Sequence, residues 1–228
     1  IKFFHNNLGN LYSPKCYNRP MLHAHKNYFL FFFLIIIPLS IKSEEDPFIF
    51  IDTNAQKMAD VLIKNVELFE EDRTLYEDKI KEIFEPMIDF RRVAFSVMGK
   101  KYYLMATKDQ RDEFVLIFKD SLLDNYASTL AKWGDSTITT VFPDEYQSDF
   151  EKNVEVRQIL DTGTSKYPIS YKLRKNKDGW KIVNIIINGL NLGLTMRNQF
   201  QALATSSNED IETTIKNWNS DFGDAGIS

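Results

Sequence analysis

The chain of 228 residues is poor in the side chains on which most enzyme sites depend. Its one cysteine is Cys16, and its three histidines are His5, His23 and His25. Beyond residue 43, therefore, a Ser-His-Asp triad, a cysteine nucleophile, an HExxH zinc site and a thiolate metal site are excluded. The sequence also lacks the GxxxxGKS and GxGxxG phosphate-binding motifs. We expect no catalytic site, no metal site and no cofactor in this chain.

Long apolar runs are also missing, except for Tyr28–Ile37 near the N-terminus. This run is too short for a membrane span of roughly 20 residues, and it follows a polar, weakly basic stretch, as in a secretory signal peptide. We expect residues 1–20 to be a non-native upstream extension and residues 21–43 to be the signal peptide, beginning at Met21. An uncleaved N-terminal anchor is the alternative.

Basic charge is scarce in the rest of the chain. Residues 1–43 hold five of the 28 Lys and Arg residues and none of the 32 Asp and Glu residues, so the remainder carries a net charge near −9. Proteins that bind nucleic acid present a basic face, which this composition argues against. The same charge disfavours strong adhesion to an anionic membrane. The length that remains is that of one ordinary domain, which we place at residues 44–220.

Apolar periodicity predicts that the domain begins with helices. The strongest pattern covers 107–131, where apolar side chains recur every three to four residues behind a capping box formed by Thr107 and Gln110. Earlier helices are predicted at 52–69, with Asp52 or Thr53 as the N-cap, at 73–84, before Pro86, and at 87–98, before Gly99.

After residue 134 the apolar period changes from helical to alternating. Strands are predicted at 137–141, 154–160, 169–175 and 180–187, and Lys177-Asp178-Gly179 is typical of a hairpin turn. Helices follow at 192–204 and, capped by Ser207 or Asn208, to about Trp218, with a loose tail at 221–228. This order predicts an α+β fold in which helices pack on one face of a curved antiparallel sheet, as in NTF2-like domains. A curved sheet with helices across its concave face can hold a cavity.

Two blocks of the sequence carry a family resemblance. The first contains Asp89-Phe90, Leu104 and the run Ala106–Leu130. The second contains Pro168–Arg174, Asp178–Asn184, Asn188-Gly189-Leu190 and Arg197-Asn198-Gln199-Phe200. In their order and spacing they resemble the MlaC family, also called toluene-tolerance auxiliary proteins, over about residues 50–220. The chain departs from the family pattern at Asn184, where Asp is usual, and at Asn191, where Ser is usual.

The resemblance implies a periplasmic carrier that shuttles glycerophospholipids between the outer and inner membranes and so maintains outer-membrane lipid asymmetry. It implies as partners a phospholipid, an inner-membrane ABC transporter with a ring of lipid-binding domains, and an outer-membrane lipoprotein–porin complex. It also implies that part of the apolar interior is an open lipid cavity. The side chains expected to line it are Phe90, Val93, Val97, Leu104, Phe114, Phe118, Val156, Ile169, Tyr171, Leu173, Ile185 and Ile187.

Two other readings stay open at the level of sequence. One is an NTF2-like enzyme that uses a carboxylate or a tyrosine in a small apolar pocket. The other is an interaction module whose core is filled. Aromatic residues make up 14% of the chain, and the sequence does not distinguish a filled aromatic core from an open one.

Overall fold

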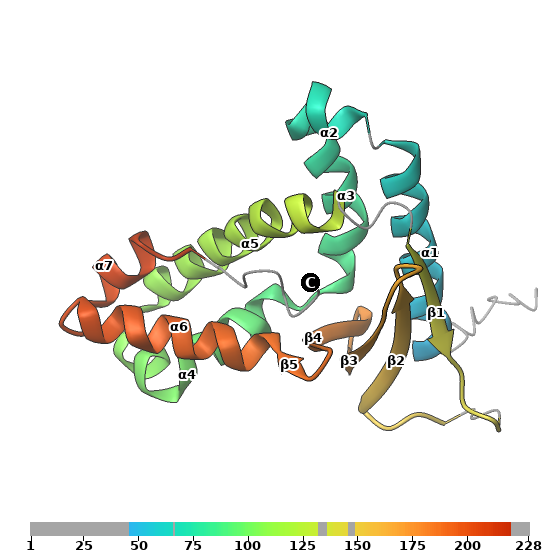
Figure 1. Ribbon diagram of the computed structural model, residues 1–228. Helices are drawn as coiled ribbons and strands as arrows, with labels where there is room; N and C mark the ends of the chain where they lie inside the picture. The colour runs from blue at the N-terminus through green and yellow to red at the C-terminus, as the bar shows by residue number, and fades with distance from the viewer. Residues whose placement is uncertain (1–45, 66, 132–135, 146–148, 220–228) are drawn as a thin grey trace, which may run out of the picture. The chain divides into compact units, whose positions relative to one another are not determined.

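The computed structural model describes residues 46–65, 67–131, 136–145 and 149–219, which belong to one domain (Figure 1). Side chains are described up to residue 125 of the long helix and again from residue 136. The predicted upstream extension, signal peptide and C-terminal tail lie outside the described residues.

A five-stranded antiparallel sheet forms the floor of the domain, with the strands in the order in which they occur along the chain. Its side chains alternate between two faces, as strand geometry requires. Val156 on β2 is paired with Tyr171 on β3, and Gln158 on β2 with Ile169 on β3, so these four side chains share one face. The strands are β1 (Thr137–Val141), β2 (Asn153–Asp161), β3 (Lys166–Asn176), β4 (Gly179–Ile187) and β5 (Leu190–Asn191).

Helices lie along the sheet and against one another. Helix α1 contacts β1 and β2, whereas α3, α4 and α6 contact β4 (Figure 1). The predicted fold class, α+β with helices on one face of a curved antiparallel sheet, is confirmed. The helices are α1 (Pro47–Lys64), α2 (Leu68–Glu71), α3 (Arg73–Met87), α4 (Phe90–Met105), α5 (Lys108–Ala131), α6 (Leu192–Ser206) and α7 (Ile211–Lys216).

The first helix begins earlier than the sequence pattern indicated. Asp46 is its N-cap and accepts a hydrogen bond of 2.7 Å from the backbone N–H of Phe48, and Pro47 occupies the first helical position. Proline suits that position because its missing N–H would have had no helical partner. The predicted start at Asp52 or Thr53 was therefore wrong.

The last helix and the third helix also differ from prediction. Asp210, rather than Ser207 or Asn208, caps α7, accepting from the N–H of Thr213 at 2.7 Å. Helix α3 continues through Pro86 to Met87, where the predicted pattern ended before the proline. A proline in the final turn removes only one hydrogen bond at a place where helices already end.

The long helix α5 confirms its predicted cap. The N–H of Thr107 donates to Oε1 of Gln110 at 2.9 Å, and the N–H of Gln110 donates to Oγ1 of Thr107 at 3.2 Å. Two otherwise unpaired backbone donors are thereby satisfied. Before it, α4 breaks at Gly99, as predicted, but helical structure resumes and continues to Met105.

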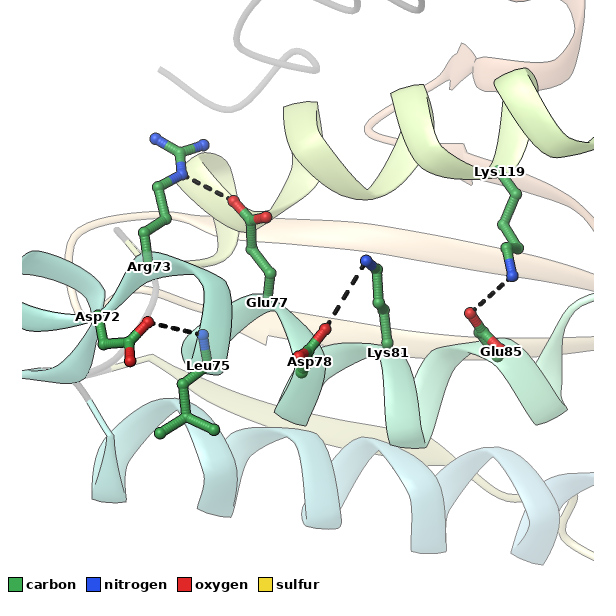
Figure 2. Close-up of polar contacts among 8 residues, drawn as sticks. All are labelled: Asp72, Arg73, Leu75, Glu77, Asp78, Lys81, Glu85 and Lys119. Carbon is green, nitrogen blue, oxygen red and sulfur yellow. Dashed lines mark hydrogen bonds and ion pairs between the residues drawn. The ribbon is translucent and has the colours of Figure 1, made fainter.

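Helix α3 is held by polar contacts along its exposed side (Figure 2). Asp72 caps its first turn by accepting from the N–H of Leu75 at 3.0 Å. Two ion pairs lie within the helix, Arg73 with Glu77 at 2.7 Å and Lys81 with Asp78 at 3.8 Å. In Figure 2 Lys119 of α5 points to Glu85, at 2.9 Å, and so joins α5 to the end of α3.

Candidate functional site

The described part of the domain contains an apolar cavity bounded by helices and the sheet. Its volume is about 140 Å³, on a scale in which one water molecule requires roughly 10–15 Å³. The walls are formed by Ile51, Asn54, Ala55, Met58, Ala59 and Leu62 of α1, by Ile80, Phe84 and Met87 of α3, by Val93 of α4, by Leu122 and Leu123 of α5, and by Leu192 and Met196 of α6. The floor is formed by the inward face of the sheet, from Ile138 on β1 to Ile187 on β4.

The few polar side chains in this lining are mostly engaged with the protein. Asn54 Nδ2 donates to the carbonyl oxygen of Phe50 at 2.7 Å, and Gln158 Nε2 donates to Oγ1 of Thr140 at 2.8 Å. Asn184 donates through Nδ2 to Asn191 at 2.9 Å and accepts from the N–H of Gly193 at 3.0 Å. The lining that remains is largely hydrocarbon, which suits an apolar ligand.

Five of the twelve residues predicted to line the cavity lie in its wall, and they come from two elements of the sheet and one helix. They are Val93 on α4, Ile169 and Tyr171 on β3, and Ile185 and Ile187 on β4. The alternation of β3 and the apolar run of β4 were the signals that indicated the four strand residues. Whether these residues contact a lipid stays a prediction.

The other seven predicted residues lie elsewhere. Phe90, Val97, Val156 and Leu173 are buried in the main hydrophobic core, and Leu104 has 64% of its surface exposed. Phe114 and Phe118 are fully buried in an aromatic cluster with Phe200 of α6 and Trp218 beyond α7. Neighbouring side chains fill the space around these two rings, which therefore belong to the hydrophobic core.

The aromatic cluster is closely packed. The ring centroids of Phe114 and Phe200 are 4.9 Å apart at 65°, and those of Phe114 and Trp218 are 5.7 Å apart at 75°. Edge-to-face pairs at such distances are favourable beyond the area they bury. The cluster thus joins α5, α6 and the C-terminal segment, and none of its four rings lies in the cavity wall.

Sequence reasoning missed the helical wall of the cavity. Met58 and Leu62 of α1, with Ile80 and Phe84 of α3, lie in the apolar stripes that predicted those helices. The stripes indicated that these side chains face inward. Which inward side chains border open space depends on how α1 and α3 are set against the sheet, and periodicity carries no signal for that.

A second, polar cavity of about 220 Å³ adjoins the first, with Val93 and Asn184 shared between them. Arg197 of α6 lines this cavity and donates through Nε to the carbonyl oxygen of Ser96 at 2.6 Å, and through a terminal nitrogen to Ser96 Oγ at 2.8 Å. This bond joins α6 to α4 just before the break at Gly99. The role of Arg197, which belongs to the second sequence block, is therefore to attach α6 to α4.

Within the ranges that the structure describes, no group of three or more His, Cys, Asp or Glu side chains is placed to hold a metal ion. Nor is any described helix both long and apolar enough to cross a membrane.

An α+β domain with an apolar cavity between its sheet and its helices has the form expected of a protein that binds hydrophobic ligands. Sequence comparison gives the family: the profile of the MlaC protein matches residues 52–220. The chain belongs to the MlaC family, as the resemblance of its two sequence blocks predicted.

Two relatives show the extent of the similarity. The chain is 27% identical over 186 residues to the toluene tolerance protein ttg2D of Pseudomonas putida, which covers 81% of this chain and 85% of that protein. It is 22% identical over 178 residues to the intermembrane phospholipid transport system binding protein MlaC of Haemophilus influenzae, which covers 77% of this chain and 74% of that protein.

A solved structure has the same fold. The phospholipid-binding protein from Ralstonia solanacearum, determined in complex with a phospholipid, superposes with a TM-score of 0.67 at 23% sequence identity. The superposition covers 75% of this chain and 94% of that one. The fold of the domain is therefore that of a known lipid-binding protein.

Proposed function

We propose that this chain is a phospholipid carrier of the MlaC family that works in the periplasm. The observation that carries the proposal is the apolar cavity between the sheet, α1 and α3. Relatives of the same family are named for intermembrane phospholipid transport and for toluene tolerance. In this reading the acyl chains occupy the cavity and the headgroup remains in water.

The energy available from such a site is sufficient for transient extraction of a lipid. Each methylene that leaves water for an apolar environment gains about 0.8 kcal/mol, so two acyl chains gain roughly 20 kcal/mol before the costs of binding. A cavity that binds both chains can therefore compete with a bilayer. The chain itself carries no nucleotide-binding motif, so the proposal leaves any energy input to a partner.

The proposed partners follow from the family. An inner-membrane ABC transporter with a ring of lipid-binding domains, and an outer-membrane lipoprotein–porin complex, would exchange lipid with the carrier. Transport between these membranes requires secretion across the inner membrane, which is the role we propose for residues 21–43.

The proposal is tested by filling the cavity. Ala59 of α1 lies in the cavity wall, and Ala59→Phe places a ring in space that an acyl chain would occupy. We expect severalfold less phospholipid to be recovered by solvent extraction of the purified variant, with no fall in melting temperature, because filling a cavity commonly stabilises a protein.

Ala202→Phe is the matched control, since Ala202 is exposed on α6 and outside the cavity wall. Its lipid content should equal that of the unmodified protein. Equal lipid in both variants, or no lipid in the parent protein, would contradict the carrier reading.

Native mass spectrometry of the parent protein separates the carrier from its main rival. A bound diacyl lipid supports the carrier, whereas a small polar ligand would support an enzyme of NTF2-like fold. The described lining of the cavity contains no carboxylate that such an enzyme could use. Burial also raises the pKa of the Tyr171 phenol well above its usual value, so the ionised form that could act as a base is not populated at neutral pH.

A further inference from the structure

Tyr171 brings a hydrogen-bond donor into the apolar cavity. It lies in the middle of β3, paired with Val156 on β2 and with Ile185 on β4, and it is one of the cavity-lining residues. Among the described residues, no hydrogen bond or ion pair involves its hydroxyl group. Unlike the hydroxyl of Tyr76, which is closed off from accessible space, that of Tyr171 is left with room for a hydrogen-bond partner.

The environment of this hydroxyl keeps it protonated. Burial raises the pKa of the phenol above its ordinary value, which already exceeds neutral pH, although the side chain retains some accessible surface. The two observations agree because Tyr171 is in the cavity wall, where surface borders internal space rather than bulk water. The group is thus available to a ligand as a donor.

The neighbouring polar residue on the sheet does not satisfy it. Gln158 is diagonal to Tyr171 across β2 and β3, and its Nε2 donates to Thr140 Oγ1 at 2.8 Å. Thr140 in turn donates to Oδ1 of Asp52 at 2.7 Å, so the hydroxyl of Thr140 must accept from Gln158. This sequence of bonds fixes the amide orientation and leaves Gln158 Oε1 buried without a donor.

The other polar side chains in the lining either form hydrogen bonds with the protein or lie at the edge of the sheet. Asn54 and Asn184 donate to the protein itself, and Ser136 is a half-buried residue just before the edge strand β1. On the sheet floor, Tyr171 is therefore the donor that a ligand would meet.

A glycerophospholipid has the complementary group. Its acyl chains are joined to glycerol by esters, whose carbonyl oxygens accept hydrogen bonds and lose those of water when they enter an apolar cavity. We propose that the Tyr171 hydroxyl donates a hydrogen bond to an acyl ester carbonyl of the bound lipid, so that the site selects ester-linked over ether-linked phospholipids. This inference rests on the proposed function.

The test is a competition between two lipids that differ only in this group. The full chain is equilibrated with an equimolar mixture of dipalmitoyl phosphatidylethanolamine and its dihexadecyl ether analogue, and the bound ratio is measured by mass spectrometry. We expect the unmodified protein to favour the ester by about fivefold, the factor that one hydrogen bond supplies. Tyr171→Phe removes only the hydroxyl oxygen and should bring the ratio close to one.

Tyr76→Phe is the matched control. Tyr76 is also a buried tyrosine whose hydroxyl lacks a partner and whose pKa is raised by burial, but it is not in the cavity wall. This variant should keep the preference of the unmodified protein.

Two results would overturn the inference. One is equal binding of ester and ether lipid by the unmodified protein, and the other is a preference that survives in Tyr171→Phe; both leave the carrier function standing. If the surviving preference came with a lower melting temperature, the hydroxyl would serve the protein instead, for example by pairing with Gln158. If the unmodified protein bound neither lipid, the proposed function would fail as well.

Discussion

At the scale of single residues, Glu155 stands out on the face of the sheet away from the cavity. It accepts a hydrogen bond from Ser170 Oγ at 2.5 Å and forms ion pairs with Lys172 and with Arg157, the latter at 3.2 Å. The hydrogen bond from Lys172, then that from Ser170, lower the pKa of this carboxyl from 4.5 to about 2. The ionised form is therefore favoured by folding.

This shift predicts a pH-dependent contribution to stability. A carboxyl whose pKa is lower in the folded state stabilises the protein above its unfolded-state pKa, and the contribution disappears as pH falls through the folded-state pKa. The group is partly exposed, so we expect Glu155→Gln to cost only about 1 kcal/mol at pH 7 after solvent screening. Urea unfolding should show this difference shrinking from about pH 5 towards pH 2.

Glu151→Gln provides the reference, because Glu151 is exposed just before β2. It should follow the unmodified protein at every pH. A deficit in Glu155→Gln as large at pH 3 as at pH 7 would mean that the side chain acts through packing rather than through its charge.

At the scale of elements, the break in α4 depends on Gly99. Its backbone has φ 69° and ψ 166°, a conformation that is almost restricted to glycine. The break leaves the carbonyl of Ser96 to accept from Arg197 of α6. The bend in α4 and its attachment to α6 thus depend on one another.

Gly99→Ala should therefore destabilise the domain through conformation alone. The nearest atom that an added Cβ would meet is Nε2 of Gln201, at 3.6 Å, so there is room for the methyl group. We expect a loss of about 1–3 kcal/mol in the free energy of unfolding, from backbone strain. Lys100→Ala, at the exposed next position, should change it by less than about 0.5 kcal/mol. Equal stability of the two variants would show that the helix straightens at no cost.

At the scale of the whole domain, phenylalanine side chains occupy two different environments. Phe118 belongs to the aromatic cluster between α5, α6 and the C-terminal segment, and it is completely buried. Phe84 of α3 lies in the cavity wall and keeps some exposed surface. The same residue type therefore serves packing at one site and borders open space at the other.

The substitutions Phe118→Ala and Phe84→Ala should affect different properties, mainly stability for the first and lipid content for the second. Phe118→Ala should cost about 3–5 kcal/mol of unfolding free energy in urea, as for a buried ring. Phe84→Ala should cost less, because a ring beside a cavity has fewer atoms in contact. Lipid content, measured per folded molecule, should change in Phe84→Ala and remain the same in Phe118→Ala. The reverse pattern would place the lipid among the aromatic residues.

Local chemistry in the sequence determined most of the elements. The Thr107–Gln110 capping box, the alternation of β3 and the turn at Gly179 act between residues close in the chain, so periodicity and turn chemistry are sufficient to predict them. The absence of His and Cys after residue 43 likewise excluded whole classes of site from that part of the chain without any structure. Errors fell at helix ends, such as Asp46 and Pro86, where one cap or one proline shifts the boundary by a few residues.

The cavity was decided by tertiary structure. Phe114, Phe118 and Phe84 all lie on apolar helix stripes, and each stripe shows only that its side chains leave water. Which of them meet other side chains and which meet open space depends on the spacing of α1, α3 and α5 over the sheet. That spacing is a sum of contacts between residues far apart in the chain. Hydrophobicity is non-directional and cannot specify it from sequence alone.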